Sequence, residues 1–286
     1  MLAPRNISAN KVGRVGPNAL KDFRCGESVL RASRSTFDCI DTVWRRAGLM
    51  LALGLLGVGA AHAQSSSLEF WPEADFWYRV NPEWRFSALV PVTKYCESKN
   101  RDLNVYFQGD YAFGGSKRSR YIRLVDENRA GPMKLWLVRG GVMKGKSIGD
   151  DAGDYAEEMV YAEIHYRAPL KGGFVLSNRL RLDNRWLGDD DVYSYRYRYR
   201  VMLEKEVLRG RRSFVPYLSV EPYWDSRYSE IVRTRAVAGT TLSLSSLLAY
   251  EWNLTYQYDE HYDTTHLYAL NLIVHVFFEP KSTQAK

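Results

Sequence analysis

Cysteine is scarce in this chain of 286 residues, which contains three. Cys25 and Cys39 lie within the first 63 residues, so Cys96 alone remains in the rest of the sequence. A single thiol excludes an intramolecular disulfide in that part of the chain. The fold there must therefore be stabilised by packing, hydrogen bonds and charge pairing.

Long apolar runs are missing as well. The longest, residues 47–60, is shorter than the roughly 20 residues that cross a bilayer as a helix. Arg45 and Arg46 precede it, and the small-x-small sequence Ala61-His62-Ala63 follows it. This order of segments predicts a secretory signal peptide over residues 44–63, cleaved between Ala63 and Gln64.

The chain is thus expected to have three parts. Residues 1–43 are polar and basic without periodicity, and we interpret them as an N-terminal extension. A start codon assigned too far upstream would explain it, with a long n-region of the signal peptide as the alternative. Residues 44–63 are the signal peptide, and residues 64–286 are the mature domain. Gln64 stands where a lipoprotein would have cysteine, which argues against a lipid anchor.

The basic charge belongs mostly to the predicted precursor segment. Residues 64–286 keep 31 of the 40 basic and 29 of the 33 acidic residues, a net charge of +2. Nucleic-acid binding calls for a clustered basic face, which this balance does not support. We therefore expect no nucleic-acid partner.

From about residue 66 onward, apolar and polar residues alternate repeatedly. A period of two is typical of a sheet with two unlike faces. The pattern predicts an all-β fold, a twelve-stranded antiparallel transmembrane β-barrel. The expected strands lie near 73–80, 84–95, 102–113, 118–127, 133–144, 154–168, 174–187, 192–206, 214–224, 231–242, 247–258 and 265–278.

The segment 192–206 divides most clearly into two faces. One face carries four tyrosines, and the other carries Arg196, Arg198 and Arg200. An arginine that faces lipid at the bilayer midplane costs roughly 2–4 kcal/mol, so three on one strand would cost on the order of 10 kcal/mol. In a membrane barrel these arginines must point into the lumen. The alternative is a soluble lipocalin-like barrel or sandwich, with arginine outside and tyrosine in the core.

Three features favour the membrane barrel. The predicted signal peptide exports the chain, and the last expected strand ends on the aromatic Phe278. The 20 tyrosines and 8 tryptophans fit the aromatic girdles of such barrels. We therefore expect the mature chain in the outer membrane of a Gram-negative-type bacterium. Its partners would be outer-membrane lipid, lipopolysaccharide (LPS) and, during biogenesis, the barrel-assembly machinery; the oligomeric state stays open.

The charges of the connections predict an orientation. If both termini are periplasmic, the connections near 145–154, 188–192 and 259–264 face outward, and all three are rich in aspartate. The opposite connections, 169–173 and 209–212, are basic. We therefore expect an acidic outer rim and a basic inner rim, with ordinary solvated loops as the alternative.

Several stretches also resemble a known family. They read LSNRLRLDNRW, YRYRYRVMLE, PYLSVEPYWD and RTRAVAGTTLSL. They resemble a domain-of-unknown-function family of outer-membrane β-barrels, distantly similar to the oligogalacturonate-specific porins. The resemblance is strongest from Ser177 to Phe278, with Asn178 among its markers. It implies a twelve-stranded barrel and no established activity.

The candidate site is the lumen itself. Its expected lining residues are Arg179, Arg181, Asp183, Arg185, Arg196, Arg198, Arg200, Glu204, Glu221, Arg233, Arg235 and Glu251. Unpaired arginines would form a narrow channel for small anionic solutes. Arginines paired with Asp183, Glu204, Glu221 and Glu251 would instead form a structural lattice. Both interpretations stay open, and the transported solute cannot be inferred.

Catalysis is the remaining alternative, as an outer-membrane enzyme that acts on lipid A or phospholipid. It would depend on His261 and His266, which flank an acidic connection that could also bind a divalent cation. His165 and His275 lie within expected strands, where ordinary wall residues are the simpler interpretation. No Ser/His pairing typical of a hydrolase is evident. We expect no enzyme activity, no cofactor and no metal.

Overall fold

A computed structural model describes residues 66–95, 101–115, 121–127, 131–148, 155–188, 192–210, 212–261 and 266–279. The chain divides into two compact units, Met1–Ala63 and Gln64–Lys286, and the fold belongs to the second. The predicted extension and signal peptide lie outside the described residues. No helix in the described part of the chain is both long and apolar enough to cross a membrane.

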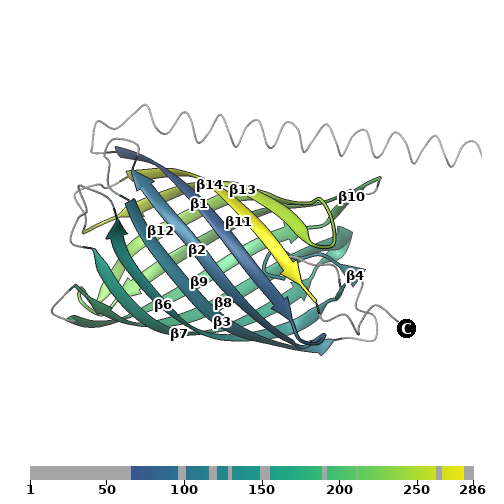
Figure 1. The fold of residues 1–286 in the computed structure, drawn as a ribbon, viewed down its shortest axis with the longest axis horizontal. Helices are drawn as coiled ribbons and strands as arrows, with labels where there is room; N and C mark the ends of the chain where they lie inside the picture. The colour runs from purple at the N-terminus through teal and green to yellow at the C-terminus, as the bar shows by residue number, and fades with distance from the viewer. Residues whose placement is uncertain are drawn as a thin grey trace, which may run out of the picture. The chain divides into compact units, whose positions relative to one another are not determined.

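Eleven strands form a closed barrel, and one short strand adds to it (Figure 1). The pairing of β11 with β9 closes the ring. The barrel strands are β1 (Ser66–Arg79), β2 (Trp84–Tyr95), β3 (Arg101–Gly115), β6 (Lys134–Ile148), β7 (Ala156–Pro169), β8 (Phe174–Leu187), β9 (Val192–Lys205), β11 (Arg212–Asp225), β12 (Glu230–Ser243), β13 (Leu248–Asp259) and β14 (His266–Phe278). The extra strand, β10 (Val207–Arg209), pairs with the start of β11. The predicted all-β barrel is confirmed, but the count of twelve barrel strands is wrong by one.

The seam between β1 and β14 is parallel, whereas all other neighbours in the barrel are antiparallel. It runs from Ser66 opposite His266 to Tyr78 opposite Phe278. An odd number of strands forces this, because the first and last strands then point the same way. We call the edge where β1 begins the entry rim and the edge where β14 ends the exit rim.

The parallel seam corrects the predicted orientation. The premise that both ends of the barrel share one rim is wrong, since the described chain enters at one rim and leaves at the other. The strands that flank the three aspartate-rich connections do end together at the entry rim, and those that flank 169–173 and 209–212 meet at the exit rim. Most of the aspartates themselves, including Asp150, Asp189 and Asp263, lie outside the described residues.

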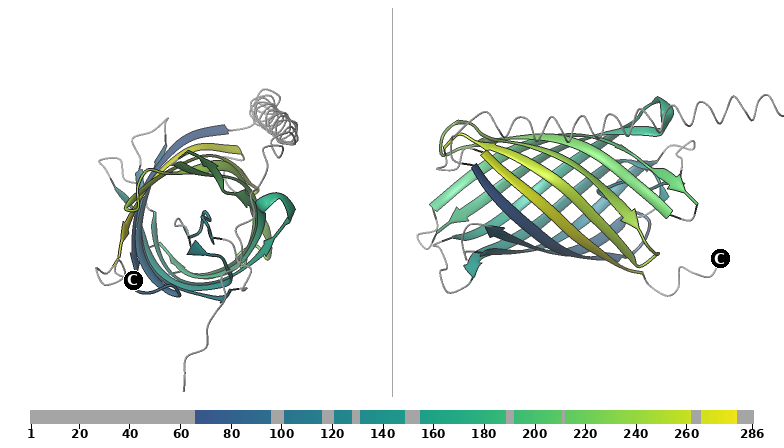
Figure 2. Two further views of the ribbon diagram at one scale, coloured as in Figure 1. Left: turned by 90° about the vertical axis from the view of Figure 1, so that its right-hand side faces the viewer. Right: turned by 90° about the horizontal axis from the view of Figure 1, so that it is seen from above.

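The predicted strand 118–127 is not part of the barrel wall. Its residues Tyr121–Ile122 form β4, which pairs with β5 (Gly131–Pro132), and the segment lies inside the ring of strands (Figure 2, left). Leu124 is 1% exposed there. Side chains of the wall bind the backbone of this segment in place of a neighbouring strand, as the Arg85 guanidinium does to the carbonyls of Asp126 (2.8 Å) and Glu127 (2.9 Å). Residues 121–127, which we call the lumen segment, therefore occupy the lumen near the exit rim.

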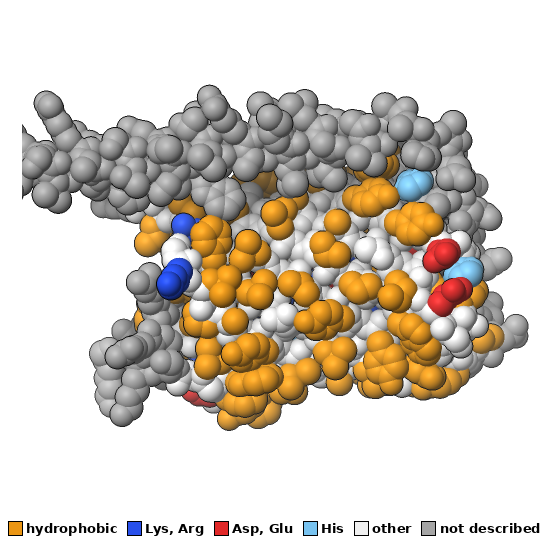
Figure 3. All heavy atoms as spheres, turned by 180° about the vertical axis from the view of Figure 1, so that it is seen from behind, with side chains coloured by type: hydrophobic (Ala, Val, Ile, Leu, Met, Phe, Trp, Pro, Cys, Tyr) orange, Lys and Arg blue, Asp and Glu red, His pale blue; other side chains and the backbone are white. Residues whose placement is uncertain are grey.

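The two faces of the wall differ sharply in polarity. On β8, Leu180 is 50% exposed on the outside, and the next residue, Arg181, is 7% exposed on the inside. Hydrophobic side chains cover the wall between the rims on the face seen in Figure 3, and charged ones appear toward its ends. Each barrel strand contributes an exposed apolar or tyrosine side chain: Phe76, Phe86, Phe107, Val142, Ile164, Leu180, Tyr197, Val220, Ile231, Leu254 and Leu270.

The predicted inward direction of the arginines is thus confirmed. The alternative with arginines outside and tyrosines in the core does not occur on β8 or β9, where Tyr197 and Tyr199 are exposed. The sheet closes on itself and is not a sandwich.

Candidate functional site

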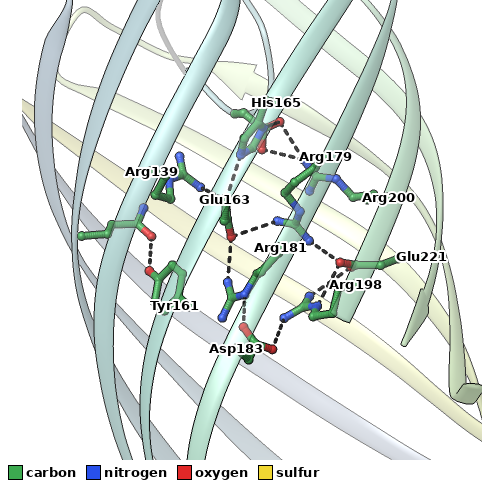
Figure 4. A network of polar contacts seen from close by, with 12 residues as sticks. Arg139, Tyr161, Glu163, His165, Arg179, Arg181, Asp183, Arg198, Arg200 and Glu221 are labelled. Carbon is green, nitrogen blue, oxygen red and sulfur yellow. Dashed lines mark hydrogen bonds and ion pairs between the residues drawn. The ribbon is translucent and has the colours of Figure 1, made fainter. Parts of the chain in front are cut away.

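The lumen contains a lattice of arginines and carboxylates, with Glu163 at its centre (Figure 4). The Glu163 carboxylate is 1% exposed and faces four nitrogen groups. The guanidinium of Arg181 lies 2.8 Å from it, that of Arg139 3.4 Å and that of Arg179 3.7 Å. His165 Nε2 is 2.8 Å from Oε2. One buried acid therefore holds side chains from three strands.

Asp183 and Glu221 extend the lattice toward β9 and β11. The carboxylate of Asp183 binds the guanidinium of Arg181, with that of Arg196 at 2.8 Å and that of Arg198 at 3.8 Å. Glu221 binds Arg179 Nη2 at 2.6 Å and Arg198 Nε at 2.9 Å. Each carboxylate is shared by at least two arginines.

The register of the strands explains why these charges meet. Residues on the same face recur every second position, and directly opposite residues on neighbouring strands are close. Glu163 on β7 stands opposite Arg181 on β8, and Asp183 stands opposite Arg196 on β9. The acidic and basic positions on neighbouring strands are therefore complementary on the lumen face.

The remaining predicted arginines also line the lumen. Arg185 binds Glu157 (2.6 Å) and Asp225 (3.2 Å). The other partners are Asp126 for Arg200 (2.6 Å), Asp259 for Arg233 and the amide oxygen of Gln257 for Arg235 (3.0 Å from Nε).

Two predicted carboxylate partners do not pair with arginine. Glu204 accepts hydrogen bonds from the Ser177 hydroxyl (2.6 Å) and from the backbone N–H of Val125 (2.7 Å), and so helps to anchor the lumen segment. Glu251 accepts from the Tyr217 hydroxyl and lies 3.3 Å from His275 Nε2. The expected pairing of both with the arginines is wrong, because wall hydroxyls, an amide N–H and a histidine meet them instead.

Part of the lattice was missed by the sequence argument. Asp110 on β3 binds both Arg85 and Arg139, the latter at 2.7 Å. Arg167, which is fully buried, binds Glu127 of the lumen segment. The sequence carries a signal for them, since Arg85, Asp110 and Arg139 each occupy the inward face of an alternating segment, as the predicted arginines after residue 174 do.

The opposite part of the wall, on β13 and β14, carries a group of neutral polar side chains in its middle. The Asn253 amide donates to Glu251 (3.3 Å) and accepts from the Thr255 hydroxyl (3.2 Å). The Asn271 amide donates to Asn253 and to Thr255 (3.1 Å). Neutral hydrogen bonds thus connect these three side chains, while His275 on β14 lies 3.0 Å from Asp75 and 3.3 Å from Glu251.

Between the two parts of the wall lies a cavity of about 940 Å³. Ser67, Thr93, Asp102 and Gly188 line it near the entry rim, and Val125 of the lumen segment lines it on the exit side. Toward the exit rim a small apolar cluster lies in the interior, where Leu124 and Met133 pack with Val175. The described residues thus form a cavity that is bordered by the lumen segment on its exit side.

The histidines considered for catalysis engage different neighbours. His261 binds Glu230 and stacks on Tyr228 at 4.3 Å, whereas His266 lies 3.0 Å from the Tyr256 hydroxyl. Within the described ranges, no group of three or more His, Cys, Asp or Glu side chains could hold a metal ion. Asp263, in the connection between the two histidines, lies outside the described residues.

Comparison with known proteins gives one match. Residues 133–267 match the family model described as "Protein of unknown function (DUF2490)". This stretch extends from β6 to the start of β14 and includes Glu163, Asp183 and Glu221. It agrees with the resemblance to an uncharacterised barrel family, and no comparison supports the likeness to porins. No curated protein and no solved structure matches the chain.

Proposed function

We propose that residues 66–279 form a β-barrel that spans a bacterial outer membrane, with a non-conducting lumen built as a structural charge lattice. The observation that carries the proposal is the inverted polarity of the wall, apolar outside and ionic inside, as at Leu180 and Arg181. Soluble monomers rarely expose apolar patches larger than a few hundred Å². Membrane barrels alternate apolar and polar residues in this sense.

Export would follow from the predicted signal peptide, residues 44–63, with cleavage between Ala63 and Gln64. The barrel-assembly machinery would then insert the chain. Its lasting contacts would be with outer-membrane phospholipid and LPS around the apolar wall.

A structural role for the lattice is supported by its charge pairing. An anion pathway needs arginines free to attract ions, yet Asp183, Glu163 and Glu221 each neutralise several of them. Such a lattice links the side chains of four neighbouring strands, β7, β8, β9 and β11, on the lumen face of the wall. Water in the same place would not connect these strands. The barrel would therefore be rigid on this side.

The lumen segment supports the non-conducting state. Asp126 binds Arg200, Glu127 binds Arg167, and the backbone N–H of Val125 donates to Glu204. These three contacts tie residues 121–127 to the wall near the exit rim. Ions that enter from the cavity would meet the apolar packing of Leu124 and Val125 there.

Membrane embedding is tested with Leu180→Arg, on the outer face in the middle of β8. In lipid the arginine should destabilise the barrel by about 2–4 kcal/mol, measured as a lower temperature for the shift in gel migration. Leu208→Arg is the matched control, because Leu208 is 72% exposed on β10 at the exit rim. If both variants match the wild type and the protein stays monomeric without detergent, the membrane proposal fails.

The non-conducting state is tested in planar bilayers. Purified protein should give no steady current. A stable, anion-selective conductance would instead support the channel interpretation of the arginines.

A further inference from the structure

Arg235 differs from the other arginines that line the cavity. Within the described residues, each of the others has a carboxylate within 4.0 Å, whereas Arg235 has none. Its Nε and Nη2 both donate to Oε1 of Gln257, a neutral amide. Arg235 is thus the guanidinium of this cavity that has no directly bound carboxylate among the described residues.

The Arg235 guanidinium lies close to two aromatic rings. Its central carbon is 5.0 Å from the Trp71 ring centre on β1 and 5.5 Å from the Tyr223 ring centre on β11. Aromatic rings at this distance stabilise a cation. Gln257 engages Nε and Nη2, and no hydrogen bond from Nη1 to another described residue is seen. Glu69, which faces the same region, is bound instead to the Trp71 indole N–H at 2.6 Å.

Positive charge is concentrated around Tyr223. The guanidinium carbons of Arg196, Arg198, Arg233 and Arg235 all lie within 6 Å of its ring centre, at 5.3, 4.4, 5.8 and 5.5 Å. Their carboxylate partners, Asp183, Glu221 and Asp259, are partly committed elsewhere: Asp183 also binds Arg181, and Glu221 also binds Arg179. The four arginines of the cluster therefore share three carboxylates, two of which also bind arginines outside it.

The cluster borders the open part of the cavity. A volume of about 940 Å³ falls in the range of small-molecule sites. Across it, Asn253, Thr255 and Asn271 present amide and hydroxyl groups. A ligand here would meet cationic donors on one side and neutral polar groups on the other, which does not suit an acyl chain.

We infer that the cavity binds a small soluble solute through a carboxylate or phosphate group placed at Arg235, beside Tyr223. An anion at this position supplies a directly bound counter-charge, and arginine is well suited to the geometry of both groups. This inference rests on the proposed barrel and gives its closed lumen a ligand class: the barrel would bind the anion from the entry rim without passing it through.

The test is calorimetric titration of the full chain, folded in detergent, with succinate, with inorganic phosphate and with neutral 1,4-butanediol. We expect succinate or phosphate to bind and butanediol not to bind. Arg235→Gln should weaken binding by at least about tenfold, the scale of one charge-assisted hydrogen bond. Arg209→Gln removes the same charge from an exposed position on β10 and should bind as the wild type does.

If Arg235→Gln does not fold, Arg235→Lys takes its place. It keeps the charge beside the rings but loses the planar fork, so binding should be weaker than in the wild type. The inference is overturned if neither anion binds the folded barrel, or if the Arg209 and Arg235 variants lose affinity equally. Heat-dependent gel migration reports separately whether the barrel has formed, so failure of the membrane proposal would be seen independently of anion binding.

Discussion

The two halves of the lumen wall pair their buried polar side chains in different ways. On β7, β8 and β9 the inward positions carry arginines and acids that bind in shared groups, as around Glu163. On β13 and β14 a group of amides and a hydroxyl, Asn253, Thr255 and Asn271, is joined by local hydrogen bonds. Both halves satisfy buried polar groups, but the first relies on shared charge pairs and the second, which we call the amide half, relies in its middle on neutral hydrogen bonds.

The difference predicts how each half responds to damage. Removing one member of a buried charge group leaves its partners uncompensated in a low-dielectric site. Removing one amide from the hydrogen-bonded group beside the cavity leaves donors and acceptors to which water from the cavity can bind. A substitution in the ionic half, on β7, β8 and β9, should therefore lower the free energy of unfolding more than one in the amide half, on β13 and β14.

The largest effect is expected for Glu163→Gln. The substitution keeps the shape of the side chain and removes the charge that Arg139, Arg179 and Arg181 share. Breaking a buried pair costs about 3–5 kcal/mol, and Glu163 is too buried for solvent to screen the loss. Chemical unfolding in detergent would measure it.

Glu158→Gln is the matched control, five residues earlier on the same strand. Its carboxylate pairs with Lys144 on the outer face, where the side chain is 58% exposed. An exposed pair contributes about 0–1 kcal/mol. If the Glu163 variant is no less stable than this control, the lattice does not support the fold.

An intermediate effect is expected for Asp126→Asn in the lumen segment. Both oxygens of Asp126 accept from Arg200 Nη2, at 2.8 and 2.6 Å. Losing a hydrogen bond to a charged group costs about 1.5–3 kcal/mol. The loosened segment should also give brief openings in bilayer recordings, which Glu230→Gln at the entry rim should not.

The stability difference between Asp126→Asn and the wild type should hold down to mildly acid pH. Burial acts to raise the pKa of Asp126, but Arg200 and His165 outweigh it and hold that pKa well below its usual range. A lowered pKa contributes stability above the unfolded pKa of about 3.9. The difference should stay constant from about pH 7 to 4.5 and shrink only at lower pH. A difference that disappears by about pH 5 would contradict this anchor.

The sequence was sufficient to predict which way the wall residues point. Period-two alternation on β8 and β9 places Arg181 and Arg198 on one face, and the cost of arginine in lipid favours that face as the lumen. Both side chains do face inward. The local pattern and one energetic argument were enough to predict these directions, because each residue of a barrel strand points either to the lumen or to the outside.

The same pattern could not reveal which segments join the wall. Residues 121–127 contain tyrosine, isoleucine and valine, which favour extended backbone, but this composition does not report which segment the backbone pairs with. Arg85, which binds the carbonyl of Glu127, lies 42 residues away in the sequence. Because this segment is not in the wall, the barrel has an odd number of strands and a parallel seam. For the same reason the first strand begins at the rim opposite to the predicted one.

The smallest effect is expected for Asn253→Ala in the amide half. Asn253 is 4% exposed, and its amide links Glu251, Thr255 and Asn271. A neutral hydrogen bond contributes about 0.5–1.5 kcal/mol, and water from the adjoining cavity can replace the lost partner, so we expect a loss near the low end. Combining it with Glu163→Gln should give additive losses within about 0.5 kcal/mol, because the two side chains share no partner. Unfolding of the single and double variants under one set of detergent conditions would measure this. A loss as large as that of Glu163→Gln, or strong coupling between the two, would show that the halves act as one network.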